Sequence, residues 1–450
     1  MKSILITAMQ SGSGKTMMSC ALMAAMKKRG IRIRAFKCGP DYIDPMFHER
    51  ALGVPSRNLD RFLQGRDGME RSLKRSDAEL GILEGAMGYY DGINGTEEAS
   101  AWSIARTTGT PAVLVLRPKG SGVTLAAQVR GLRDFRPESG IQALLLTDCR
   151  ETLYRCLKPV LERETGLPVL GFLPPMPEAE IENRHLGLLT AAEITDLSRR
   201  LERLAQEAEK HIDLDRLLTL SEKGEKQTTA IPAAGAVQKG RCRIAVARDE
   251  AFCFCYADSL DALREAGAEL CFFSPLRDAG LPEGVRGLYI PGGYPELYAE
   301  TLGENTAMRK DIAAAVAEGI PTVAECGGFL YLQESLEDAN GKSFPMCGVL
   351  PGHGFRTERL QRFGYQYVTA AEDSLLFRAG ERVPAHEFHY WDSSDNGNAL
   401  RSEKPDGRSW SCGYANRNLY AGFPHLHLDG EVPLAERFER ACEAWNASRN

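Results

Sequence analysis

The sequence predicts an α/β protein made of two doubly wound domains. Short β-branched and apolar runs alternate with helical stretches, which is the rhythm of a parallel sheet covered by helices on both faces. In the first half the expected strands are 4–8, 31–38, 80–84, 112–116, 144–147 and 169–173. The rhythm restarts with strands expected at 243–247, 269–273, 287–291 and 321–325, and with a helix expected over 259–266. The chain therefore should contain two sheets.

A segment of different composition separates the two halves. Residues 195–220 have the periodicity of an amphipathic helix, whereas 221–240 are rich in Lys, Glu, Thr, Ala, Gly and Pro without a hydrophobic period. We therefore expect a first domain at 1–220, a linker at 221–241 and a second domain at 242–450. A chain of 450 residues gives each domain enough length to bury a core without disulfides or structural metals.

The composition excludes several classes of function. Hydrophobic residues make up 43% of the chain, charged residues 26%, and the formal net charge is −6. Basic residues are scattered and nearly balanced by acids, so we expect no nucleic-acid partner and no membrane partner. The apolar run 3–9 is too short for a signal peptide, and the twelve dispersed cysteines lack zinc-site spacing. These features predict a cytoplasmic protein whose oligomeric state, including a homodimer, stays open.

The segment that follows the first expected strand has the features of a phosphate-binding loop. Residues Met9–Thr16 read MQSGSGKT and lead into an apolar helical pattern. Glycines let backbone amides face the phosphates, Lys15 can reach the terminal phosphates, and the Thr16 hydroxyl can hold Mg²⁺. Ala8 stands where the usual first glycine of such a loop would be. The residues predicted to bind ATP here are Gly12, Ser13, Gly14, Lys15 and Thr16.

Charged side chains follow two further expected strands. Lys37, Asp41 and Asp44 come at the end of the second strand, and Glu84 comes at the end of the third. The carboxyl ends of parallel strands form one edge, where ligands bind. An acid beside a phosphate-binding loop is a natural second anchor for Mg²⁺, because that cation prefers hard oxygen ligands. Each acid alone is more often a cap or turn residue, but together they predict an MgATP site.

The second half carries a candidate nucleophile. The expected strand 321–325 runs into Cys326, two glycines and a helix expected over 329–336. Such an elbow exposes a thiol at a helix N-terminus, which is expected to lower the thiol pKa. A glycine-rich loop around Gly293 could offer backbone amides to an oxyanion, and His425 near the C-terminus could supply the base.

These motifs together resemble the cobyrinic acid a,c-diamide synthase family. The first half resembles its P-loop amidoligase through the variant loop and the segments Lys37–Pro45 and Glu84–Gly92. The second half resembles a class I, triad-type glutamine amidotransferase domain. Its further segments of resemblance are 249–254, 272–276, 362–365 and 386–390. The resemblance covers nearly the whole chain except the linker, and implies a P-loop NTPase-like sheet followed by a flavodoxin-like one.

The resemblance also implies roles for individual residues. The implied Mg²⁺ ligands are Thr16, Asp41 and Glu84; the phosphate-neutralising cations are Lys15 and Lys37; the residues facing the tetrapyrrole carboxylate or positioning its phosphorylated form are Tyr42, Asp44 and Asp91. Cys326 and His425 would be nucleophile and base. His427 stands where ordinary class I enzymes carry a glutamate, so we expect a Cys-His dyad. We interpret His386 and His389 as structural or substrate-facing rather than as metal ligands.

The activity that the resemblance implies is ATP-dependent amidation in cobalamin biosynthesis. Glutamine hydrolysis releases ammonia, MgATP phosphorylates the a and c acetates of cobyrinic acid, and ammonia attacks the acyl phosphates. ATP, glutamine and a corrinoid carboxylate are the implied small-molecule partners. Other interpretations are the same chemistry on hydrogenobyrinic acid or nickel-sirohydrochlorin, a cobyric acid synthase, and a P-loop switch ATPase of the partitioning type. Glutaminase activity separates the last from the others.

Overall fold

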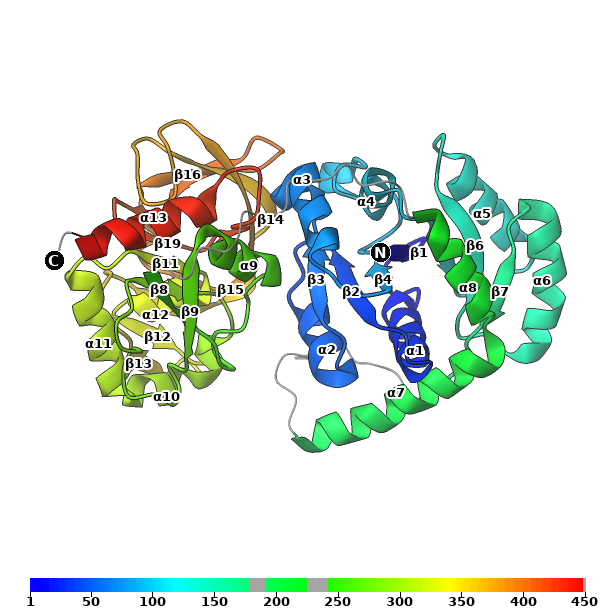
Figure 1. The fold of residues 1–450 in the computed structure, drawn as a ribbon, viewed down its shortest axis with the longest axis horizontal. Coiled ribbons are helices and arrows are strands. Elements are labelled where there is room, and N and C mark those ends of the chain that lie inside the picture. Colours follow the sequence, from blue (N-terminus) through cyan, green and yellow to red (C-terminus); the bar gives the residue numbers. More distant parts are fainter. Residues whose placement is uncertain (178–190, 225–241, 448–450) are drawn as a thin grey trace. The chain divides into compact units, whose positions relative to one another are not determined.

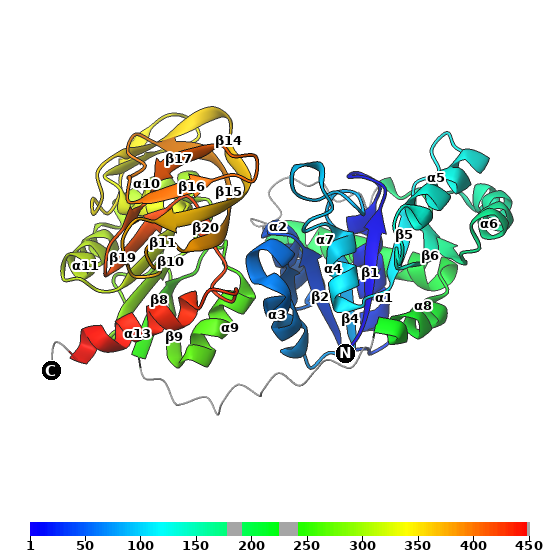
Figure 2. The same cartoon turned by 90° about the horizontal axis from the view of Figure 1, so that it is seen from above.

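The computed structural model describes residues 1–177, 191–224 and 242–447, and the chain forms two compact units, Met1–Ile231 and Pro232–Asn450 (Figures 1 and 2). Most of the expected linker 221–241 lies outside the described residues; its first four residues end one helix and form a short 3-10 turn, η4 (Glu222–Gly224). Within the described residues, no helix is long and apolar enough to cross a membrane.

A parallel sheet forms the centre of the first unit. Its order is β3-β2-β4-β1-β5-β6-β7. The strands are β1 (Lys2–Ala8), β2 (Ile33–Cys38), β3 (Ser56–Leu59), β4 (Leu80–Glu84), β5 (Ala112–Leu116), β6 (Ile141–Leu146) and β7 (Val169–Phe172). The six strands expected from the sequence are confirmed. The edge strand β3 was not expected, because its sequence SRNL carries no hydrophobic run.

Helices cover both faces of this sheet (Figure 1). Along β1, Ile4 and Ile6 belong to one apolar cluster and Leu5 to the other, because side chains alternate across a strand. The first cluster is closed by α1 (Lys15–Lys28), α2 (Ile43–Leu52), α7 (Ala191–His211) and α8 (Leu214–Ser221). The second is closed by α3 (Arg61–Lys74), α4 (Ala101–Thr108), α5 (Val123–Asp134) and α6 (Glu151–Thr165), with the short turn η1 (Ile93–Gly95) preceding α4.

The single helix expected over 195–220 is wrong, because the structure has two helices, α7 and α8. The break occurs where the chain meets β7: Asp213 N donates to Leu170 O at 2.7 Å. The Asp213 carboxylate then accepts a hydrogen bond from Arg216 N at 3.0 Å and caps α8. A side chain that caps a new helix favours a start rather than a continuation.

A second, mainly parallel sheet forms the centre of the other unit. Its order is β18-β19-β11-β10-β8-β9. The strands are β8 (Cys242–Ala247), β9 (Ala268–Phe273), β10 (Gly287–Ile290), β11 (Thr322–Glu325), β18 (Tyr414–Ala415) and β19 (Leu419–Gly422). Among the described strands of this sheet, β18 pairs antiparallel with β19 and the others pair in parallel. The parallel strands follow the order second, first, third, fourth, fifth, which is the flavodoxin-like order predicted by the resemblance.

The second unit also contains a sheet that the sequence did not reveal. Its strands are β12 (Ser335–Glu337), β13 (Ser343–Pro345), β14 (His353–Ala370), β15 (Arg382–Ser393), β16 (Leu400–Glu403), β17 (Ser409–Cys412) and β20 (His425–Leu426). β14 and β15 form a long antiparallel pair, and β15 pairs with the short β20. The helices of this unit are α9 (Ala257–Ala266), η5 (Pro295–Tyr298), α10 (Ala299–Glu304), α11 (Thr306–Ala317), α12 (Gly327–Leu332) and α13 (Leu434–Ala447).

The helix expected over 329–336 is placed wrongly at both ends. α12 begins at Gly327 and ends at Leu332, and β12 begins at Ser335. The helix stops because Gln333 adopts an extended conformation and its side-chain amide donates to Ser393 Oγ at 2.5 Å and Asp395 O at 3.0 Å. These partners lie far away in sequence, so the local pattern could not show them.

We predict that Leu217→Ala in α8 lowers the free energy of unfolding of the first unit by about 2–5 kcal/mol, because a fully buried leucine leaves a cavity. Scanning calorimetry of the full chain measures this. The exposed neighbour Arg216 is the control, and Arg216→Ala is expected to change stability by less than about 0.5 kcal/mol. Equal effects of the two changes would contradict the packing described for α8.

Candidate active sites

The phosphate-binding loop of the first unit connects β1 to α1. Gly12 and Gly14 have φ angles of 73° and 84°, which a side chain would strain. A Cβ on Gly14 would also lie 2.8 Å from Thr147 Cγ2, at the end of β6. Lys15 is buried, and its Nζ donates to Gln10 O at 3.0 Å and Met87 O at 2.5 Å. The backbone thus holds the lysine head at the loop.

Glu84 gathers the charged groups beside this loop. It ends β4, which lies between β1 and β2 in the sheet. Its Oε1 accepts hydrogen bonds from Thr16 Oγ1 at 2.7 Å and from Lys37 Nζ at 2.8 Å. Lys37 also forms an ion pair with Asp44 Oδ2. The structure therefore brings together four of the predicted site residues from separate segments of the chain.

Burial and charge pairing oppose each other in this cluster. Burial by itself would raise the pKa of Glu84, but Lys37 and His48 hold that pKa well below its ordinary value. Burial would lower the pKa of Lys37, but Glu84 and Asp44 hold it well above the ordinary value. Burial lowers the pKa of Lys15 to about 8, helped by the neighbouring Lys37, and burial raises the pKa of Asp44 to about 6. The cluster thus contains two cationic side chains, Lys15 and Lys37, that could pair with the negative charges of a bound polyphosphate.

The remaining predicted residues lie in the loops around this cluster. Asp41 Oδ1 accepts hydrogen bonds from Ile43 N at 2.7 Å and Asp44 N at 3.3 Å, so it closes the turn that leads into α2. Tyr42 directly precedes that helix. Asp91 Oδ2 accepts from Gly88 N at 2.9 Å in the turn after β4. In this structure one oxygen of each aspartate is therefore engaged with the backbone.

His48 is a member of the cluster that the sequence did not reveal. It is fully buried on α2, with Nε2 3.5 Å from Glu84 Oε2 and Nδ1 3.1 Å from Ser56 Oγ. The available signal was its position four residues after Asp44, which puts both side chains on one helix face.

The second unit holds Cys326 in a strained elbow. Cys326 follows β11 and has φ 49° and ψ −104°, a conformation that side chains rarely adopt. Hydrogen bonds fix it, because Cys326 N donates to Gly422 O at 2.8 Å and Cys326 O accepts from Leu330 N at 3.0 Å. A Cβ on Gly328 would lie 2.1 Å from Ile290 O, so only glycine fits this bend.

His425 and the Gly293 amide converge on this elbow. A Cβ on Gly292 would lie 2.5 Å from His425 Cε1 and 3.4 Å from Cys326 Cβ, so the predicted nucleophile and the predicted base flank the same backbone atom. A Cβ on Gly327 would lie 3.1 Å from Gly293 N. The predicted dyad and the predicted oxyanion amide are thus neighbours, although Gly293 and His425 lie 132 residues apart in the sequence.

Burial shifts the pKa values of both members of the predicted dyad toward their uncharged forms. Burial raises the pKa of Cys326 far above its ordinary value, and the nearby Glu296 and Glu387 act in the same direction against the Gly327 amide. Burial also lowers the pKa of His425 to about 3, helped by His389. The expectation that the helix N-terminus lowers the Cys326 pKa is therefore wrong here, because the loss of solvent outweighs the short helix α12. A thiol beside a neutral imidazole transfers its proton as it attacks.

Two acids beside the dyad were not singled out from the sequence. Glu325 is buried; its Oε1 accepts from Leu426 N at 2.9 Å and its Oε2 from Tyr289 OH at 3.0 Å, and burial raises its pKa to about 8. Burial raises the pKa of Glu296, in the turn η5, to about 7. Glu325 directly precedes the nucleophile, and that adjacency was the only signal.

His427 is also buried, and its ring stacks on Tyr256 with centroids 4.8 Å apart. The resemblance assigns this position to the acid of ordinary class I enzymes. The expectation of a Cys-His dyad stays a prediction.

Comparisons with known proteins match both halves. The model of the CobQ/CobB/MinD/ParA nucleotide binding domain matches residues 4–189, and that of the CobB/CobQ-like glutamine amidotransferase domain matches residues 243–433. A cobyrinate a,c-diamide synthase of Clostridium acetobutylicum is 36% identical, covering 98% of this chain and 100% of that protein. Proteins of the same name from Listeria innocua and Thermoplasma volcanium are 40% and 34% identical, covering 95% and 99% of this chain and 96% and 98% of theirs.

We predict that Lys37→Met lowers the free energy of unfolding by about 3–5 kcal/mol near pH 8, because it leaves Glu84 and Asp44 buried without their cation. The deficit should shrink toward pH 5. In the variant the folded state raises the carboxyl pKa values, so stability falls as the pH rises and is regained as the carboxyls take up protons. Calorimetry at both pH values checks this. The double variant Lys37→Met/Glu84→Gln should recover part of the loss; no recovery would contradict the ion pair as the cause.

We predict that Gly292→Ala lowers kcat for glutamine hydrolysis by about 100-fold, because the new methyl group displaces the His425 ring by about an ångström. Ammonia release from glutamine measures this. Gly131, whose added Cβ would meet nothing within 4 Å, is the matched control, and Gly131→Ala should hydrolyse glutamine as the parent does. Unchanged hydrolysis by Gly292→Ala would show that His425 does not act from beside Gly292.

Proposed function

Because the chain belongs to the cobyrinate a,c-diamide synthase family, we propose that it amidates the a and c acetate carboxylates of cobyrinic acid in cobalamin biosynthesis, using ATP and glutamine. The observation that supports this proposal is that one chain assembles both sets of predicted site residues. A cysteine elbow with its histidine supports a glutaminase, and a phosphate-binding loop with a buried Lys-Glu cluster supports carboxylate activation. We assign the synthetase to 1–220 and the amidotransferase to 242–450.

The glutaminase step begins at Cys326. Its Sγ attacks the glutamine carboxamide carbon while its proton passes to His425, and the tetrahedral oxyanion lies against the Gly293 and Gly327 amides. His425 then gives the proton to the leaving nitrogen, so ammonia departs and a γ-glutamyl thioester remains. Water attacks the thioester with His425 as base, which releases glutamate and restores the thiol. A dyad whose pKa values favour the uncharged forms suits this sequence, since no charge has to be held in the buried elbow until the thiol attacks.

The synthetase step activates a carboxylate. A substrate carboxylate oxygen attacks the γ-phosphorus of ATP, ADP leaves, and ammonia then displaces phosphate from the acyl phosphate to form the amide. Lys15 and Lys37 neutralise phosphate charge, which is the main contribution a protein makes to phosphoryl transfer. Gly12, Ser13 and Gly14 supply the loop backbone that surrounds the phosphates.

The residues at the loop fit a Mg²⁺ ion. Thr16 Oγ1 and Glu84 Oε1 lie 2.7 Å apart, and such a hard-oxygen pair, with phosphate oxygens and waters, suits a cation that keeps part of its hydration shell. In our proposal Thr16 and Glu84 hold the ion and Asp41 completes the set. The described residues contain no group of three or more His, Cys, Asp or Glu that could hold a metal without such help. A Mg²⁺ ion held there would neutralise part of the phosphate charge.

The substrate carboxylate is assigned to the region of Tyr42, Asp44 and Asp91. Support comes from Asp44, which pairs with Lys37 beside Glu84, and from Asp91, which follows the same strand end. A substrate carboxylate could replace Asp44 as the partner of Lys37, because burial already raises the Asp44 pKa to about 6 and so weakens its hold on the negative charge.

The first experiment incubates the purified protein with MgATP, glutamine and cobyrinic acid and follows product mass. We expect the gain of two amides. Cys326→Ala should give the diamide with ammonium but not with glutamine, because only the ammonia source is lost. Hydrogenobyrinic acid and nickel-sirohydrochlorin are tested in parallel.

Each result separates the alternatives. Hydrolysis of glutamine without change in cobyrinic acid would remove the assigned substrate but keep the amidotransferase. ATP hydrolysis without any glutaminase activity would remove the proposed function and favour a switch ATPase.

A further inference from the structure

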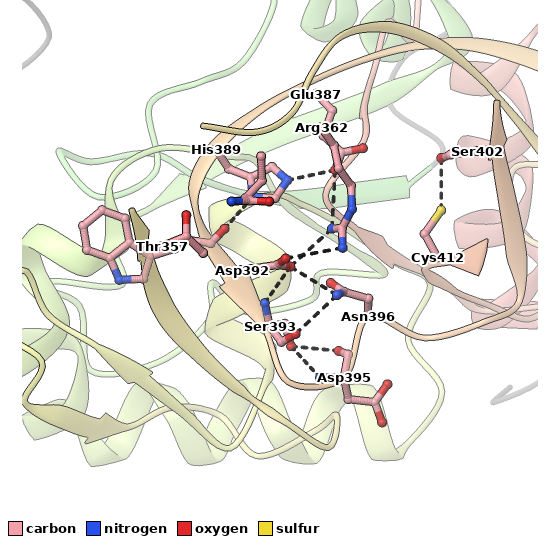
Figure 3. Close-up of polar contacts among 12 residues, drawn as sticks. Thr357, Arg362, Glu387, His389, Asp392, Ser393, Asp395, Asn396, Ser402 and Cys412 are labelled. Atoms are coloured by element: carbon pink, nitrogen blue, oxygen red, sulfur yellow. Dashed lines mark hydrogen bonds and ion pairs between the residues drawn. The ribbon is translucent and has the colours of Figure 1, made fainter. Parts of the chain in front are cut away.

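The segment 386–390 lies on β15, the strand that pairs with β20, and it carries a buried polar pair, Glu387 and His389 (Figure 3). His389 Nε2 lies 2.8 Å from Glu387 Oε1, and His389 Nδ1 lies 2.5 Å from Trp391 O. Glu387 is 1% exposed and His389 is 5% exposed. Trp391 O is an acceptor, and an ionised Glu387 accepts a hydrogen bond as well, so with an ionised Glu387 both bonds form when the ring carries two protons. The geometry points to an imidazolium held by a carboxylate.

Other groups around Glu387 complete its hydrogen bonding. Gln366 Nε2 donates to Glu387 Oε2 at 2.6 Å, and Arg362 Nη1 lies 3.8 Å from Glu387 Oε1. Arg362 has a nearer partner, Asp392, at 3.2 Å (Figure 3). Glu387 is therefore shared between His389 and a neutral amide at close range, while the arginine is balanced by another acid.

The pair contacts the framework of the dyad on two sides. The His389 ring stacks on Phe423 with centroids 3.8 Å apart and planes 5° apart. Phe423 stands two residues before His425 and meets Phe329 of α12 edge to face at 5.2 Å. On β15, His386 is the register partner of His425 in β20. A change in the His389 ring therefore reaches both the base and the helix that follows the nucleophile.

The charges near the dyad come from several elements. The titratable or charged groups facing His425, Cys326 and the pair are His386, Glu387 and His389 of β15, Arg362 of β14, Lys404 after β16, Glu325 of β11 and Glu296 of η5. Burial and then His389 lower the pKa of His425. His389 is thus the charged neighbour that opposes a proton on the base.

We propose that Glu387 and His389 are positioning residues that hold His425 beside Cys326 and supply the positive charge that keeps it a proton acceptor. The inference rests on the glutaminase half of the proposed function. It assigns to the pair the orienting task that ordinary class I enzymes give to their third residue, whose place here is taken by His427. The mechanical part acts through the stack on Phe423, and the electrostatic part acts through the imidazolium.

Two variants separate these parts. His389→Phe keeps an aromatic ring on Phe423 but removes the charge, so the acid limb of kcat/KM for glutamine should move to higher pH by about one unit. The direction follows because a base without a cationic neighbour binds its proton more tightly. His389→Ala removes the stack as well, and its kcat should be about 10-fold below that of His389→Phe at every pH. Glu387→Gln should move the acid limb in the same direction as His389→Phe. Without its counter-ion the His389 ring gives up its positive charge, and that charge then no longer opposes a proton on His425.

Controls distinguish these effects from misfolding. His353 is an exposed histidine on β14, and His353→Phe should leave the limb and kcat unchanged. Ammonium-dependent amidation should stay at the parent rate in every variant, since the dyad is not needed when ammonia is supplied. A merely structural role would lower kcat without moving the acid limb.

A second measurement does not depend on any activity. Histidine NMR follows the titration of His425, whose signal is assigned by its loss in His425→Ala. The midpoint should be higher in His389→Phe than in the parent, and an equal or lower midpoint overturns the proposal even if glutamine hydrolysis has changed. If the parent hydrolyses no glutamine but the His425 midpoint is still higher in His389→Phe than in the parent, the proposed function falls and the electrostatic assignment stands.

Discussion

Both sites depend on the alignment of parallel strands, whose carboxyl ends lie at one edge of a sheet. In the first unit the register pairs Lys37 with Glu84 across β2 and β4, and Ile6 with Glu84 across β1 and β4. The strand end that carries Glu84 therefore lies between the phosphate-binding loop and Lys37. In the second unit Glu325 is paired with Gly422 across β11 and β19. The elbow at Cys326 and the segment that leads from β19 to His425 therefore start side by side. A shift in either register would separate the reacting groups.

The two sites handle burial in opposite ways. The first keeps its charges, because Glu84 is bonded to Thr16 and Lys37 and the paired groups offset each other's loss of solvent. The second favours an uncharged dyad, because burial raises the pKa of Cys326 and lowers the pKa of His425. The difference suits the proposed chemistry, in which fixed cations bind a polyanion and the thiol loses its proton only as it attacks the substrate.

The antiparallel sheet of the second unit positions His425, the proposed catalytic base of the flavodoxin-like core. β20 consists of two residues, and its pairing with β15 holds His425 in place. The same β15 carries Glu387 and His389 on the side that meets Phe423. A short strand has little stability of its own. The position of the base therefore depends on a long hairpin, β14 with β15, that lies outside the parallel core.

The sequence by itself determined the expected parallel strands, the phosphate-binding loop and the identity of Cys326 and His425 as the candidate dyad. These features follow from local patterns: apolar runs, glycines at bends and a nucleophile after a strand. Only the tertiary structure decided the break before α8, the end of α12, the roles of His48 and Glu325, and the direction of the Cys326 pKa. Each of these is set by burial or by partners that are distant in sequence, and a local pattern carries no information about either.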